Sequence, residues 1–87
     1  MTELDIFCRN FRYLREISEL SLKEMAKCVG ISVYSAKRIE QGFVPRTVKT
    51  GTLLAIFVSF GVTPSDMFVD DKENVLKLYK HFRRMLH

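Results

Sequence analysis

The sequence predicts an all-α fold built as one small domain. Apolar residues recur at three- and four-residue steps along most of the chain, which is the spacing of amphipathic helices. Glycines and prolines fall at boundaries between these stretches, where they end one helix and let another begin. A length of 87 residues leaves room for one compact core and excludes a multidomain enzyme. We therefore expect six short helices and no strands.

The first helix is expected over about residues 3–18. Its apolar residues follow helical spacing and comprise Leu4, Phe7, Cys8, Phe11 and Leu14. Residues at this spacing share one side of a helix, so the stripe should face the core while the other side meets water.

Two shorter helices are expected next, over about 21–29 and 32–41. Ser21 and Glu24 form a capping box, in which each side chain satisfies a backbone N–H that the helix start leaves unpaired. Gly30 then ends the helix, since glycine readily adopts the left-handed conformation that follows a last turn. A serine two residues later can cap the next helix, and a second glycine follows its end.

A loop and a fourth helix come after the second of these glycines. The residue before Pro45 is pushed out of the helical region, which predicts a loop over about 42–47. The following helix, over about 48–60, contains no charged residue after position 49. We expect its core-facing side to consist of Leu53, Ile56, Phe57 and Phe60.

The last part of the chain predicts two further helices. The segment Thr63-Pro64-Ser65-Asp66 places a cap before a proline in the first turn, and this short helix should end near Phe68. Asp70 and Asp71 mark the start of the last helix. Its apolar stripe consists of Val75, Leu78, Tyr79, Phe82, Met85 and Leu86.

The formal net charge of +4 is unevenly distributed. Residues 51–71 contain three acidic residues and no lysine or arginine, whereas residues 72–87 contain five basic residues and one acidic residue. Residues 23–49 contain six basic residues against two acidic ones. A local basic excess of this kind suits binding to a polyanion.

Several classes of function are disfavoured by the sequence. Cys8 and Cys28 lack the spacing of a metal site, so we expect free thiols, no metal and no cofactor. The longest uncharged stretch is too short for a membrane span, and no secretory signal precedes it. We expect a cytoplasmic protein that is not an enzyme, does not associate with membranes and binds no small-molecule ligand.

The segment from Leu22 to Gln41 is the most informative part of the chain. Two short helices that cross over a tight turn need a very small residue at the crossing and a turn residue that tolerates positive φ. Ala26 and Gly30 meet these two needs. Polar and basic residues occupy the outer positions of the second helix, which predicts a helix-turn-helix that presents residues 32–41 to a groove.

The chain resembles the phage repressor and Cro type helix-turn-helix family, also called the XRE family, over about residues 4–68. The resemblance rests on five short motifs in the same order and spacing: Leu14-Arg15-Glu16, Leu20-Ser21-Leu22-Lys23-Glu24-Met25-Ala26, Gly30-Ile31-Ser32, Ile39-Glu40-Gln41-Gly42 with Pro45, and Phe60-Gly61-Val62-Thr63-Pro64-Ser65-Asp66-Met67-Phe68. It implies a five-helix repressor-type bundle, to which this chain adds a C-terminal sixth helix. It also implies a transcriptional regulator that binds double-stranded DNA as a dimer.

The resemblance also implies roles for individual residues. The base-reading side of the recognition helix would comprise Val33, Tyr34, Lys37 and Arg38. The phosphate backbone would be contacted by Ser21, Gln41 and Arg46. Arg15 and Glu40 are the only charges in two otherwise apolar stripes, and we expect them to form a largely buried ion pair.

We expect residues 1–70 to form the DNA-binding domain and residues 71–87 to form a helix that covers it or dimerises. The fourth and last helices would contribute the contact residues Gly51, Leu54, Ala55, Val58, Leu78 and Phe82. Two arrangements would cover these apolar surfaces, since the last helix can fold over its own domain or pack against a second copy of the chain. We favour the homodimer, because one helix-turn-helix contacts only half of a symmetric site.

A protein-interaction module is the alternative function, either an adaptor or an antitoxin-like partner of a toxin with the same fold. Such a module would favour exposed apolar residues on the third helix, whereas a DNA reader needs basic ones there. Lys37 and Arg38 favour the DNA reader.

Overall fold

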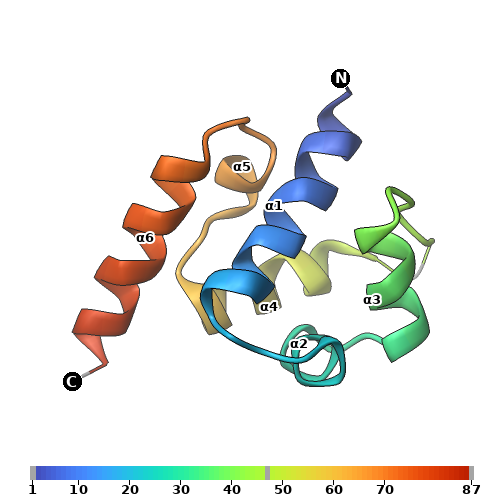
Figure 1. The fold of residues 1–87 in the computed structure, drawn as a ribbon, viewed down its shortest axis with the longest axis horizontal. Coiled ribbons are helices and arrows are strands. Elements are labelled where there is room, and N and C mark those ends of the chain that lie inside the picture. Colours follow the sequence, from blue (N-terminus) through green and yellow to red (C-terminus); the bar gives the residue numbers. More distant parts are fainter. Residues whose placement is uncertain (1, 47, 87) are drawn as a thin grey trace.

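The computed structural model describes residues 2–46 and 48–86, and these residues form a bundle of six helices without strands (Figure 1). The prediction of an all-α fold is confirmed. The helices are α1 (Glu3–Ile17), α2 (Leu22–Val29), α3 (Val33–Glu40), α4 (Thr50–Phe60), α5 (Pro64–Met67) and α6 (Lys72–Met85).

The caps that the sequence predicted are present at several helix starts. The Ser21 hydroxyl accepts from the Glu24 N–H at 3.1 Å, and the Glu24 carboxylate accepts from the Ser21 N–H at 2.9 Å. The Thr63 hydroxyl accepts from the Asp66 N–H at 3.3 Å, directly before the proline that opens α5. These bonds satisfy N–H groups that have no partner inside the helix, which fixes where each helix begins.

Helix α1 lies at the centre of the bundle, where it contacts α3, α5 and α6. Its buried aromatic rings pack with side chains from the other helices into one core. The largest fully buried side chains include Phe7, Phe11, Leu14, Met25, Ile39, Ile56 and Met67. Burial of such side chains is the main stabilising contribution in a domain of this size.

Two residues of α1 depart from the predicted stripe. Leu4 is 54% exposed, because the first turn of α1 extends past the core. Asn10 is buried instead, and its amide donates to the carbonyl oxygens of Met67 at 2.9 Å and Val69 at 3.0 Å. These two bonds connect α1 to the end of α5 and satisfy both amide protons of a group that would be costly to bury alone.

Helix α4 differs from the prediction in its start and in its orientation. It begins at Thr50 rather than 48, because Lys49 is extended and its N–H donates to the Thr52 hydroxyl. The buried side consists of Thr52, Ile56 and Phe60, which follow one another at four-residue steps. Phe57, which was expected in the core, is 45% exposed because it lies one position beyond this row.

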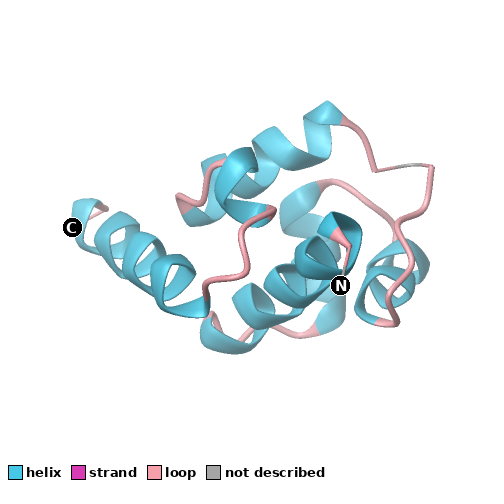
Figure 2. Cartoon of the chain, turned by 90° about the horizontal axis from the view of Figure 1, so that it is seen from above, coloured by secondary structure: helices cyan, strands magenta, loops and turns pink. Residues whose placement is uncertain are grey.

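Helix α6 packs on α1, α4 and α5 of its own chain. Val75 and Tyr79 are buried there, and a Cβ built on Gly61 would lie only 2.5 Å from the Phe82 Cβ. Figure 2 shows that the last turns of α6 extend away from the other helices, and Met85 is 73% exposed. Most of the apolar stripe of α6 is therefore used within the chain.

Candidate nucleic-acid interface

The turn between α2 and α3 depends on a glycine and an alanine. Gly30 has φ 74° and ψ 32°, a left-handed conformation that few other residues adopt without strain. The N–H of Ile31 donates to the Ala26 oxygen at 3.0 Å, which closes the last turn of α2. Ala26 is 1% exposed, so it provides the small buried contact that the helix crossing requires.

Helix α3 has one buried and one exposed side. Ala36 and Ile39 are fully buried, and the Ser32 hydroxyl caps the helix by accepting from the Ser35 N–H at 3.0 Å. The opposite side projects into solvent, with Tyr34 72% exposed and Lys37 also exposed. The buried side fixes the orientation of the helix, and the exposed side is available to a partner.

The four residues expected to read bases are not equivalent in the structure. Val33, Tyr34 and Lys37 are exposed, whereas Arg38 is partly buried. The Arg38 guanidinium carbon lies 4.2 Å from the centre of the Phe43 ring. This contact was not predicted from the sequence, although Phe43 directly follows the glycine at the end of the recognition helix and could have indicated it.

The three residues expected to contact phosphates are all exposed: Ser21, Gln41 and Arg46. Ser21 precedes α2, and its hydroxyl oxygen accepts the Glu24 N–H within the capping box. The carboxylate of Glu24 lies at the same helix start, and its bonds with the backbone N–H and hydroxyl of Ser21 lower its pKa. An anion that approaches Ser21 therefore also meets a negative charge.

Arg15 and Glu40 join α1 to the last turn of α3. Arg15 Nε lies 2.5 Å from one carboxylate oxygen of Glu40, and its terminal nitrogen lies 2.9 Å from the other. Arg15 also donates to the Leu20 carbonyl at 3.2 Å. The hydrogen bond to Glu40 raises the pKa of Arg15. The side chains are 24% and 13% exposed, so most of each side chain is buried at the edge of the core.

Comparison with known families identifies this arrangement. Residues 10–73 match the family described as the Cro/C1-type HTH DNA-binding domain. The chain belongs to this family. It is therefore a helix-turn-helix DNA-binding protein, as the resemblance implied. Among curated proteins and among solved structures, none matches the chain.

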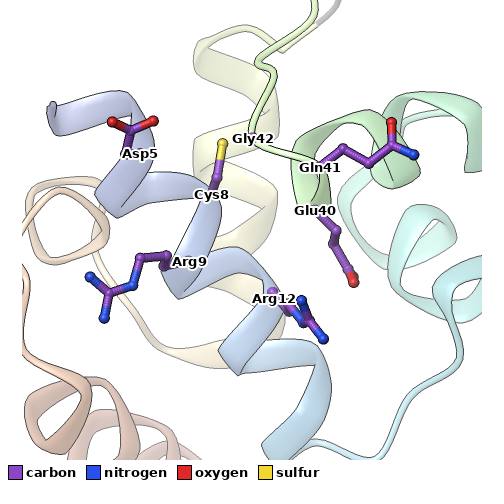
Figure 3. Close-up of a pocket in the computed structure, with 7 residues that line it drawn as sticks. All are labelled: Asp5, Cys8, Arg9, Arg12, Glu40, Gln41 and Gly42. Carbon is purple, nitrogen blue, oxygen red and sulfur yellow. The ribbon is translucent and has the colours of Figure 1, made fainter. Parts of the chain in front are cut away.

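An open groove of 220 Å³ is lined by residues of α1 and of the end of α3 in this Cro/C1-type domain. In Figure 3, Cys8 points toward Gly42, while Arg9 points away from α3. Burial raises the pKa of the Cys8 thiol, and the charge of Asp5 adds to this effect. A protonated thiol is a poor nucleophile and a poor metal ligand, so we assign this cysteine to packing.

Two further features of the Cro/C1-type domain concern other functions. Within the described residues, no group of three or more histidine, cysteine, aspartate or glutamate side chains is arranged to hold a metal ion. None of the described helices has the length and apolar character needed to cross a membrane.

Proposed function

We propose that this protein reads specific sequences of double-stranded DNA by placing α3 in the major groove. The observation that carries the proposal is the contrast between the two sides of α3. Ala36 and Ile39 hold one side in the core, while Lys37 and Arg38 lie on the other side with Tyr34. A major groove admits one α-helix, and basic side chains on its exposed side can reach base edges.

The proposed contacts follow from the chemistry of each side chain. Lys37 and Arg38 donate to the O6 and N7 acceptors of guanine, and Val33 and Tyr34 contact thymine methyl groups. Contacts to the phosphate backbone of the DNA come from a separate set of polar residues that flank the helix-turn-helix in sequence, namely Ser21, Gln41 and Arg46. Phosphate contacts position the protein, whereas base contacts give sequence preference.

In this proposal residues 1–70 carry the DNA interface and residues 71–87 brace its far side. Figure 1 supports this division, because α3 and α6 lie at opposite ends of the longest axis of the molecule. That axis extends 34 Å, so a duplex held by α3 lies away from the basic side of α6. We also propose that the protein binds as a homodimer.

Selection of bound sites from random duplex DNA tests the proposal with the purified full chain. Lys37→Ala and Arg38→Ala should each weaken binding to the selected site more than to random duplex, by about 1 to 3 kcal/mol of discrimination. Arg46→Ala should weaken binding to both DNAs alike and lower the salt slope by about one unit. Titrations at several salt concentrations measure both effects.

Two outcomes would count against this function. Selection that returns no enriched sequence would remove sequence-specific recognition. Equal losses on selected and random DNA for all three variants would show that α3 contributes charge but does not read bases.

A protein-interaction module is the second candidate, and it is favoured by the exposed apolar residues on and after α3. Val33 is 44% exposed, Tyr34 72% and Phe43 55%. Apolar and aromatic side chains of this kind anchor protein interfaces. A failed DNA selection, followed by a partner whose binding depends on Tyr34, would establish this alternative.

A further inference from the structure

Phe43 is an exposed aromatic residue with one well-defined contact. It lies outside the apolar core and is 55% exposed, so its ring is not explained by burial. Its N–H donates to the Arg38 oxygen at 2.9 Å, which holds the loop against the last turn of α3. The ring then lies under the Arg38 guanidinium, 4.2 Å from the guanidinium carbon.

The backbone explains why the ring can reach this position. Gly42 follows the C-cap of α3 with φ 99°, a conformation that turns the chain sharply back toward the helix. The N–H of Gly42 donates to the Ile39 oxygen at 2.9 Å. Phe43 is thereby placed beside α3 rather than beyond its end.

Arg38 has no competing charge partner among the residues that the structure describes. The ion pairs there join Arg9 to Asp70 and Arg15 to Glu40. A guanidinium that stacks on an aromatic face keeps the N–H groups at its edge free to donate in its own plane. These are the groups that bind the O6 and N7 atoms of guanine in pairs.

We propose that Phe43 is a positioning residue that holds the Arg38 guanidinium ready for a paired contact with one guanine of the site. This inference rests on the proposed function and adds a specificity-determining residue to it. Lys37 is exposed on the same helix, and the cation–π contacts of the described residues involve Arg38, Lys72 and Arg83 instead, so Lys37 should contribute less discrimination between bases. Stacking reduces the freedom that Arg38 loses on binding, which improves affinity for the correct base.

The test uses the full chain and the duplex obtained by selection. Each guanine of the site is replaced in turn by 7-deazaguanine, which lacks the N7 acceptor. Phe43→Leu removes the aromatic face but keeps an apolar side chain, and Phe43→Tyr keeps the face as the matched control. Arg38→Ala identifies the guanine that the arginine contacts, since this variant should no longer respond to the replacement at that position. Thermal unfolding of each variant monitors the fold.

We expect 7-deazaguanine at one position to weaken binding of the unsubstituted protein about tenfold. Phe43→Leu should weaken binding to the unmodified site about three- to fivefold, the size of an exposed cation–π contact, and should reduce the 7-deazaguanine effect at that same position. Phe43→Tyr should behave as the unsubstituted protein, and all variants should unfold at similar temperatures.

The positioning role and the proposed function fail in different ways. If Arg38→Ala abolishes the 7-deazaguanine response but Phe43→Leu leaves it unchanged, Arg38 reads the base without help from Phe43 and the inference is overturned. Tighter binding by Phe43→Leu would also overturn it, because the stack would then be holding Arg38 away from DNA. If no duplex is enriched at all, the proposed function fails first.

Discussion

Arg15 and Glu40 carry the clearest stability prediction for single residues. Arg15→Ala should lower the free energy of unfolding by about 3 kcal/mol, because it leaves the less exposed Glu40 carboxylate without its cation. Glu40→Ala should cost less, about 2 kcal/mol, since Arg15 keeps its bond to the Leu20 oxygen and more contact with water. Urea denaturation measures both values.

Asp70→Ala provides the control for this prediction. Asp70 pairs with Arg9 at 3.5 Å, and both side chains are about half exposed, at 45% for Arg9 and 54% for Asp70. Removal of an exposed pair of this kind should cost less than about 1 kcal/mol. Losses of the same small size for Arg15→Ala and Glu40→Ala would show that their pair behaves as a surface contact.

Glu24 predicts a pH dependence of stability. Its bonds with Ser21 lower the pKa of the carboxyl in the folded state, so the ionised form stabilises α2. This contribution is fully present above the pKa of the unfolded state and is lost as the pH falls through the lower pKa of the folded state. The Glu24→Gln variant should therefore lose less stability on acidification than the unsubstituted protein does.

Thermal unfolding between neutral and acidic pH measures this difference. Glutamine can still accept from the Ser21 N–H, so the helix start is kept while the titration is removed. Glu19→Gln, an exposed carboxylate between α1 and α2, is the matched control and should follow the unsubstituted protein. Identical acid profiles for all three proteins would contradict the prediction.

At the residue scale, contacts between distant parts of the chain were the least predictable. The sequence predicts the Ser21 cap because both partners lie within one turn. Asn10 could not be predicted to lie in the core, since its carbonyl partners at Met67 and Val69 follow it by 57 and 59 residues. The contact between Arg38 and the Phe43 ring could not be predicted either, because the position of the ring depends on the turn geometry at Gly42.

At the element scale, substitution of Gly61 tests how closely α6 packs against the end of α4. Gly61 and Gly30 both have φ 74°, so alanine at either position suffers the same backbone strain of about 1 to 2 kcal/mol. Only at Gly61 would the added Cβ meet another residue, at 2.5 Å from the Phe82 Cβ. Gly61→Ala should therefore cost about 1 to 3 kcal/mol more than Gly30→Ala.

Chemical denaturation of the two alanine variants measures this difference. Gly61→Ala combined with Phe82→Gly should destabilise the protein by less than the sum of the two single losses, because the Phe82 Cβ that lies 2.5 Å from the added methyl group is then gone. The space around Gly30 is open, so it isolates the backbone effect. Equal losses at the two glycines would mean that α6 does not approach α4 this closely in solution.

The helix ends were predicted better than the helix orientations. Caps and glycines carry local signals, and they placed α2, α3 and α5 within about a residue or two, which is the ordinary uncertainty of such boundaries. Helix α4 has no charged residue to mark its outer side, so its apolar pattern allows several rotations about its axis. Packing against α2, α5 and α6 selects the one that exposes Phe57.

At the scale of the whole molecule, the position of α6 changes which surface remains for a second copy. Ala55 and Leu78, two of the expected dimer contacts, are partly buried against their own core. Phe82 contacts the position of Gly61. The apolar surface left uncovered on α4 comprises Leu54, Phe57 and Val58, which are 52%, 45% and 71% exposed.

We therefore expect a homodimer centred on the uncovered side of α4. A combined Leu54→Glu and Val58→Glu variant should be monomeric at tens of micromolar, where the unsubstituted protein should sediment as a dimer, because like charges would face each other across a twofold axis. Met85→Glu, at an equally exposed apolar residue near the end of α6, should stay dimeric. Two copies could then present their α3 helices about 34 Å apart on one face of a duplex. An unsubstituted protein that sediments as a monomer, with and without the selected DNA, would contradict this arrangement.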